Sequence, residues 1–166
     1  MSVISSNTLF HFTNSADSLI SIIKNGFYPK FCLEEISVYS VLKDENKEIA
    51  SPMTCFCDLP LSQIDKHLDF YGKYGIGMSI EWGKSNGLSP ILYVHDNSNI
   101  LNLIKQLGKR VYNVEPLDES SNLYDNAFVE IIELCSYLKP YKGKMWRTNK
   151  YESKKFYDER EWRYIP

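Results

Sequence analysis

The segment 159–165 carries two acids and an arginine at every second position: Glu159, Glu161 and Arg163. Successive side chains of a β-strand point to opposite faces of a sheet. If this segment is a strand, its three charged side chains share one face, with neighbours about 7 Å apart. The pattern therefore predicts two carboxylates and a guanidinium that point into one space. The alternative is a solvated strand whose charges pair with neighbouring side chains.

Length and charge limit the classes of protein that this chain can belong to. A chain of 166 residues suits one domain, 1–166, with a sizeable core. A formal net charge of −2 and a pI near 5.9 argue against binding nucleic acid through overall charge. One basic segment, 139–155, has aromatic residues between its lysines, which is compatible with a phosphate-binding surface or with a solvated loop.

The chain shows no targeting or metal-binding pattern. We expect a cytoplasmic location, because there is no signal-peptide pattern and no apolar run near the roughly 20 residues that a membrane helix needs. Cys55 and Cys57 are separated by one residue, a poor spacing for zinc, and no second Cys/His pair follows them. We predict no metal site, and a buried strand with free thiols at these positions.

Apolar periodicity and turn residues predict an α+β protein with a mostly antiparallel sheet and flanking helices. Strands are predicted at 8–13, 52–57, 76–82 and 91–95, the last one returning as a hairpin, besides the terminal strand. Helices are predicted after Ser15, with a buried apolar stripe and a stop at Gly26, then over 64–70, from Ser98 to Gly108, and over 122–138.

Three glycines precede the strand predicted at 76–82: Gly72, Gly75 and Gly77. Glycines leave backbone open to whatever lies beside it. Tyr71 and Tyr74 lie at the entrance to this strand, where a ring could stack on a flat ligand or cover the opened backbone. The segment is not a phosphate loop, since the Gly-Lys-Ser/Thr ending is absent.

A histidine on the first strand and carboxylates on the last suit one particular chemistry. On strict alternation, His11 faces away from Phe10 and Phe12. Cleavage of NAD between nicotinamide and ribose passes through an oxocarbenium-like centre, which a carboxylate stabilises. A histidine can orient the other ribose and an aromatic ring can stack on nicotinamide. Composition alone does not select this reaction from other pocket chemistries.

Four motifs lie along nearly the whole chain: Leu9–Thr13, Pro52–Asp58, Tyr71–Gly77 and Glu159–Arg163. Together they resemble the AbiGi family of abortive phage-resistance proteins. More distantly, the same order of motifs resembles the ADP-ribosyltransferase-like superfamily, which includes DarT-type DNA-modifying toxins and the poly-ADP-ribose polymerases. The resemblance implies an ADP-ribosyltransferase-like fold with NAD as the substrate.

Carried over by motif, the resemblance implies roles for individual residues. His11 would hold the adenosine-side ribose, with Thr13 beside it in the NAD site. Tyr74, or alternatively Tyr71, would stack on nicotinamide. Glu161 would be the catalytic carboxylate. Glu159 matches the first acid of the Glu-x-Glu pair that engages an acceptor, although members with that pair for arginine targets usually have an arginine where this chain has His11.

Two classes of function follow from the resemblance. One is a phage-defence enzyme that cleaves NAD and transfers ADP-ribose to a nucleic acid or protein, with the segment 139–155 facing the acceptor, or to water as a glycohydrolase. The other is a non-enzymatic antitoxin or regulator that binds a cognate toxin, another protein or DNA, because the AbiGi family has been labelled the antitoxin half of a two-gene system. The enzyme requires His11 and Glu161 to face one cleft, whereas the binding protein predicts that Glu161 is tied to a basic side chain.

Overall fold

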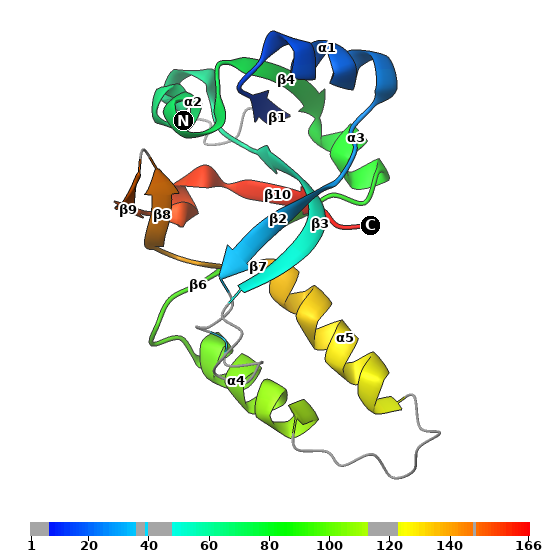
Figure 1. Cartoon of the computed structure of the whole chain (residues 1–166), viewed down its shortest axis with the longest axis vertical. Helices are drawn as coiled ribbons and strands as arrows, with labels where there is room; N and C mark the ends of the chain where they lie inside the picture. The colour runs from blue at the N-terminus through cyan, green and yellow to red at the C-terminus, as the bar shows by residue number, and fades with distance from the viewer. Residues whose placement is uncertain (1–6, 36–38, 40–47, 113–122, 148) are drawn as a thin grey trace. The chain divides into compact units, whose positions relative to one another are not determined.

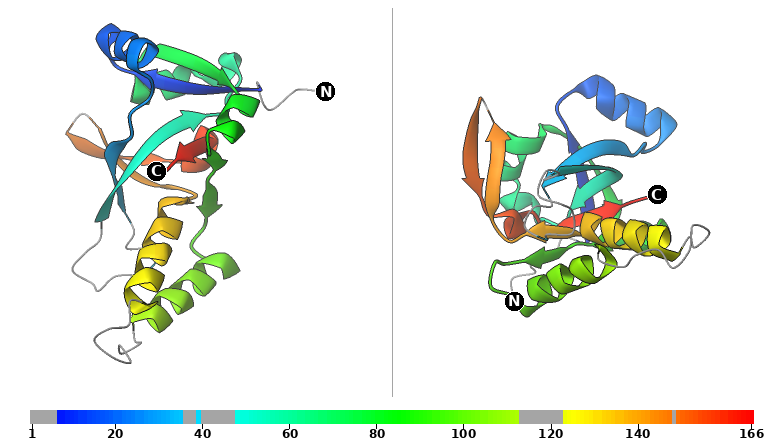
Figure 2. Two further views of the ribbon diagram at one scale, coloured as in Figure 1. Left: turned by 90° about the vertical axis from the view of Figure 1, so that its right-hand side faces the viewer. Right: turned by 60° about the horizontal axis from the view of Figure 1, so that its bottom comes forward.

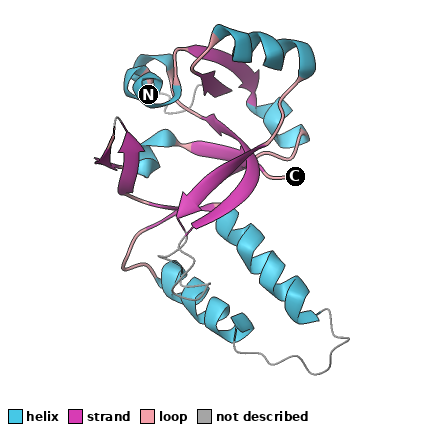
Figure 3. Ribbon diagram, in the orientation of Figure 1, coloured by secondary structure: helices cyan, strands magenta, loops and turns pink. Residues whose placement is uncertain are grey.

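A computed structural model describes residues 7–35, 39, 48–112, 123–147 and 149–166 (Figure 1). The described chain is α+β, with mostly antiparallel strands and flanking helices, as predicted (Figure 3). It divides into two compact units, the first made of Met1–Phe31, Pro52–Ile91 and Tyr157–Pro166, the second of Cys32–Ser51 and Leu92–Phe156. Segments of the two units alternate along the sequence. The single domain expected from the sequence stays a prediction.

The first unit is built on an antiparallel sheet. Its strands are β1 (Thr8–Thr13), β3 (Glu48–Cys57, which begins in the second unit), β4 (Tyr74–Ser79), β5 (Ser89–Pro90) and β10 (Glu161–Tyr164). The order of the strands is β4-β1-β3-β10-β5, and each neighbouring pair is antiparallel. A further strand, β2 (Lys30–Glu35), pairs with β3. The strands that carry His11 and Glu161 therefore lie on either side of β3.

The register assigns side chains to the two faces of this sheet. Cys57 of β3 pairs with Phe10 of β1 and with Glu161 of β10. Residues that pair directly across strands point to the same face. Phe56 pairs with Trp162 and therefore points to the other face. We call the face of Cys57 and Glu161 the carboxylate face, and the face of Phe56 and Trp162 the aromatic face.

Three helices belong to the first unit: α1 (Ala16–Asn25), α2 (Asp65–Tyr71) and α3 (Ile80–Ser85). The predicted caps of α1 are confirmed, since the Ser15 hydroxyl accepts a hydrogen bond from the N–H of Ser18 and Gly26 ends the helix at a φ of 85°. The predicted buried stripe of α1 is wrong, because Ile20 and Ile23 are exposed and no residue of the helix is buried. Strong local capping explains why this helix forms without an apolar face in the core.

The second unit holds two longer helices and two small sheets. They are α4 (Asn99–Tyr112), α5 (Leu123–Ser136), the parallel pair β6 (Leu92–Val94) and β7 (Leu138–Pro140), and the hairpin β8 (Gly143–Arg147) and β9 (Lys150–Lys154). Helices α4 and α5 lie side by side (Figure 2). The core of the unit contains Leu101 and Ile104 of α4 and Ile131 and Cys135 of α5.

Four of the expected elements differ from the structure. Residues 80–82 are helical, because the Ser79 hydroxyl accepts a hydrogen bond from the N–H of Trp82 and caps α3. The run 91–95 is no hairpin strand, since β6 pairs in parallel with β7, a partner that a local pattern does not reveal. Helix α4 continues past Gly108 to Tyr112, and α5 ends at Ser136, so local stop signals set neither end.

Candidate functional site

A buried ion pair occupies the carboxylate face on β10. Glu161 and Arg163 point to this face, with 7% and 0% of their surfaces exposed. Nε of Arg163 donates to Oε1 of Glu161 over 2.7 Å. The predicted sharing of one face by these two side chains is confirmed. Because both ions are removed from water, each depends on the other for compensation of its charge.

Glu159 reaches the same region by a different route from the one predicted. Strand β10 starts at Glu161, and Glu159 ends a 3-10 turn, Phe156–Glu159. Arg160 between them has a φ of 47°, which breaks the alternation of a strand. The side chain of Glu159 is nevertheless buried, with 3% of its surface exposed, and it accepts a hydrogen bond from the hydroxyl of Tyr71.

Cys57 lies among the acids of the carboxylate face. Burial, together with the negative charges of Glu159, Asp58 and Glu161, raises the pKa of the Cys57 thiol to about 12. Such a thiol stays protonated at neutral pH and is a poor nucleophile. The four cysteines, which all lie in described segments, form no disulfide. The negative charges of Glu159 and Glu161 therefore both act on this thiol, although Glu159 lies outside the strand on which it was predicted.

His11 lies on the aromatic face. Its Nδ1 donates to the backbone carbonyl of Cys55 over 2.8 Å. Its ring packs against Phe27 and Phe56, with centroid distances of 5.4 Å and 5.5 Å. Burial lowers the pKa of His11, the hydrogen bond to Cys55 opposes this shift and the charge of Lys30 adds to it. The imidazole therefore acts as a neutral ring within an aromatic cluster.

The sheet separates His11 from Glu161. Phe10, which pairs with Cys57, points to the carboxylate face, so the next residue, His11, points to the aromatic face. Glu161 pairs with Cys57 and points to the carboxylate face. The NAD-cleaving site would require these two side chains to face one cleft. In the structure they point to opposite faces of the sheet.

The two tyrosines separate in the same way. Tyr74 is 42% exposed and pairs with Thr13 across β4 and β1, so both point to the face of His11. Tyr71 is the last residue of α2. Its ring centroid lies 4.4 Å from that of His67, and its hydroxyl donates a hydrogen bond to the carboxylate of Glu159. The structure thus places Thr13 and Tyr74 with His11, and Tyr71 with Glu159.

The glycines of β4 are covered by phenylalanine rings of β1. A Cβ atom on Gly75 would lie 2.6 Å from the Phe12 ring, and one on Gly77 would lie 3.0 Å from the Phe10 ring. At Gly77 a methyl group of Thr8 is closer still, at 2.8 Å, so a side chain at either glycine would force its neighbours to shift. The backbone opened by the glycines is therefore filled by neighbouring side chains of the sheet.

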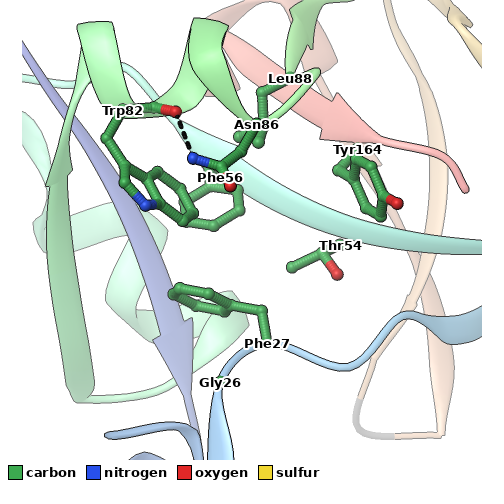
Figure 4. Close-up of a pocket in the computed structure, with 8 residues that line it drawn as sticks. All are labelled: Gly26, Phe27, Thr54, Phe56, Trp82, Asn86, Leu88 and Tyr164. Atoms are coloured by element: carbon green, nitrogen blue, oxygen red, sulfur yellow. Dashed lines mark hydrogen bonds between the residues drawn. The ribbon is translucent and has the colours of Figure 1, made fainter.

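A pocket of about 340 Å³ opens on the aromatic face of the first unit (Figure 4). Four aromatic rings line it: Phe27, Phe56, Trp82 and Tyr164. Thr54 and Asn86 supply its polar side chains, with Gly26 and Leu88 completing the wall. No local pattern reveals this pocket, because its lining comes from four separate segments and residue 82 was expected in a strand. His11 packs against two of its rings.

The basic segment 139–155 forms most of β7, β8 and β9. Several of its cations have partners within the second unit. Nζ of Lys139 lies 4.9 Å from the Phe156 ring centroid, and Nζ of Lys150 lies 3.2 Å from Glu152. Lys142 and Lys144 are exposed. The side chains of residues 146, 147 and 151 lie outside the described part of the chain, so the acceptor-facing role of this segment stays a prediction.

Within the described segments, no group of three or more histidine, cysteine, aspartate or glutamate side chains is arranged to hold a metal ion. No helix in these described segments is long and apolar enough to cross a membrane. The main feature of the carboxylate face is the ion pair of Glu161 and Arg163. The main feature of the aromatic face is the ring-lined pocket.

The fold and the site define a class: an α+β protein with a buried carboxylate–guanidinium pair on one face of its sheet and a ring-lined pocket on the other. A family model described as "Putative abortive phage resistance protein AbiGi, antitoxin" matches residues 25–166. The chain belongs to the AbiGi family, which confirms the resemblance seen in its motifs.

A curated relative supports the same assignment. The abortive phage resistance protein AbiGi of Lactococcus lactis subsp. cremoris is 33% identical over an alignment of 161 residues, and the match covers 84% of this chain. The chain spans 61% of the length of that relative. No solved structure matches this chain at a significant level.

Proposed function

We propose that this chain acts in abortive phage resistance as an antitoxin-type protein, which binds a partner protein and has no catalytic step. One observation carries the proposal: Glu161, the acid expected to be catalytic, is buried against Arg163 at 2.7 Å, on the opposite face of the sheet from His11. A carboxylate held in this way is paired with a guanidinium and is not free to bind a ribose. The description of the family as an antitoxin supports the same function.

A binding function also needs a surface that a partner can cover, and helix α4 supplies a candidate. Its buried side packs Leu101 and Ile104 into the core of the second unit. Ile100, Leu103 and Leu107, at helical spacing, are exposed. Exposed apolar side chains on one stripe of a helix are typical of a helix that docks into an apolar groove of another protein. We propose that the toxin contacts this stripe.

The test is rescue of bacterial growth. The chain is co-expressed with a candidate toxin, and growth is compared for three variants. Leu103→Glu is expected to lose rescue, since it places a charge in the interface. Asn102→Glu, the matched change at a neighbouring exposed position, is expected to keep it.

The third variant separates binding from catalysis. Glu161→Leu with Arg163→Met removes both charges and keeps apolar volume, so it is expected to fold and to rescue growth. Loss of rescue by this double variant, with the fold retained by circular dichroism, would overturn the proposal, because the carboxylate would then be needed for more than folding.

A second candidate function is an NAD-dependent ADP-ribosyltransferase or glycohydrolase with an ADP-ribosyltransferase-like fold. The order β1-β3-β10 supports it, because it brings the histidine strand and the glutamate strand to the two sides of one strand. The ring-lined pocket beside His11 supports it as well. This candidate requires Glu161, which points to the other face of the sheet, to act at the sugar, with Glu159 at the acceptor and Tyr74 or Tyr71 at the nicotinamide.

The second candidate is tested by nicotinamide release from NAD, with and without DNA, RNA and cell lysate. Release by the wild type that disappears in Glu161→Gln with its fold retained by circular dichroism, while Glu130→Gln at an exposed site keeps it, would establish the enzyme. Dependence on one addition would identify the acceptor. No release in any mixture, together with no NAD binding by calorimetry, would exclude it.

A further inference from the structure

We infer that the ring-lined pocket of the first unit binds one small, uncharged, planar heterocycle, of the size of a nucleobase or a pyridine carboxamide. The site is independent of the α4 stripe and does not depend on the proposed antitoxin function. Its volume of about 340 Å³ lies at the lower end of the range for small-molecule sites, which is roughly 300–1,000 Å³.

The walls select a flat ring. Phe27, Phe56 and Trp82 contact one another, with centroid distances between 5.0 Å and 5.8 Å. Tyr164 lies across the pocket from this three-ring cluster (Figure 4). Aromatic rings pack best against other rings, in offset or edge-to-face contact. A planar ligand between the cluster and Tyr164 would make such contacts on both sides.

Two polar groups in the pocket wall would orient a bound ligand. The Thr54 side chain lines it, and its hydroxyl is buried without a hydrogen-bond partner among the described residues. A buried hydroxyl without a partner is unfavourable in the folded protein, so a ligand that bonds it is favoured. Nδ2 of Asn86 donates to the carbonyl of Trp82 over 2.8 Å, which leaves Oδ1 on the pocket side as an acceptor (Figure 4). Together they match the polar edge of a base or an amide.

The pocket carries no charge to hold a phosphate. None of the eight described residues that line it is charged. His11, behind Phe27 and Phe56, is a neutral ring, since burial lowers its pKa. A neutral ring or nucleoside is therefore the expected occupant, and a phosphate group on it adds no contact within the pocket.

The experiment is titration of the purified chain by calorimetry and tryptophan fluorescence. The ligands are nicotinamide, adenosine, uridine, AMP and cyclohexanecarboxamide, a saturated and non-planar analogue of nicotinamide. At least one planar ring is expected to bind with a Kd below about 1 mM. The saturated amide should bind at least about tenfold more weakly than the best ring, because it loses the ring contacts. AMP should bind no more tightly than adenosine.

Variants tie the binding to this pocket. Thr54→Val should weaken the best ring about threefold to tenfold, the loss of one hydrogen bond, with an unchanged or higher melting temperature. Phe27→Leu should weaken it by about tenfold. Thr8→Val, the same chemical change on the carboxylate face, should have no effect.

Several results would overturn the inference. They are no binding by any planar ring, equal binding of the saturated amide, unchanged affinity in Thr54→Val, or binding of AMP more than about tenfold tighter than adenosine, which would indicate a phosphate site. Any of these is readable whether or not growth rescue supports the antitoxin function.

Discussion

Nε of Arg163 lies 2.7 Å from Oε1 of Glu161, and both side chains are buried on the carboxylate face of the sheet. The two residues are neighbours on that face because one residue, Trp162, separates them on β10. The pair is local, since it needs only a strand, but its burial is tertiary, because β3 and β5 flank β10. The main consequence of this pair is that Glu161, the acid expected to be catalytic, is held by Arg163 inside the folded protein.

Removal of one partner should therefore destabilise the protein. We expect Glu161→Gln to lower the free energy of unfolding by about 3 kcal/mol, because it removes a negative charge that pairs with the buried guanidinium of Arg163. The double variant Glu161→Leu with Arg163→Met should recover most of this loss. Urea denaturation followed by circular dichroism measures both. A single variant within about 1 kcal/mol of the wild type would show that the pair contributes little to folding.

The hydrogen bond between Tyr71 and Glu159 should also matter for stability. Tyr71→Phe removes the hydroxyl that donates to a buried carboxylate, so we expect a loss of about 1–3 kcal/mol in the free energy of unfolding. Tyr74→Phe is the matched control, since Tyr74 is 42% exposed, and should stay within about 0.5 kcal/mol. Equal effects of the two substitutions would contradict this role for Tyr71.

His11 should make the protein less stable at acid pH. Burial lowers the pKa of His11 in the folded state, so its contribution is present above the unfolded value of about 6.5 and is lost as the pH falls through the folded value. We expect the stability of the wild type to fall more steeply below about pH 6.5 than that of His11→Gln. Urea denaturation from pH 7.5 to 4.5 measures the difference, and carboxylates common to both proteins cancel. Parallel curves would exclude this role.

Thiol labelling should distinguish the buried cysteines. The pKa values of Cys57 and Cys135 are raised to about 12 and about 11, chiefly by burial, and both side chains are buried. We expect iodoacetamide at pH 8 to modify Cys32 and Cys55 first, because these two are partly exposed. Peptide mass spectrometry gives the order, and all four should react in urea. Modification of Cys57 as fast as Cys32 would contradict the environment described for the carboxylate face.

Local signals predicted the elements that local interactions stabilise. The strand Thr8–Thr13 and the helix between Ser15 and Gly26 follow the sequence closely, because capping bonds and the φ of a glycine act within a few residues. The same signals failed for the apolar run at 91–95, which pairs with β7, a segment more than forty positions further along the chain. They failed at Gly108 too, because a buried position on α4 tolerates a glycine within the helix.

The sequence by itself determined that Glu161 and Arg163 share one face, because alternation is a property of any strand. It also determined membership of the AbiGi family through its motifs. Only the tertiary structure decided that His11 points to the other face, since that depends on the pairing of β1 with β3. The left-handed conformation of Arg160, which takes Glu159 out of the strand, and the pocket, which joins rings from distant segments, likewise arise from packing between elements that no local pattern encodes.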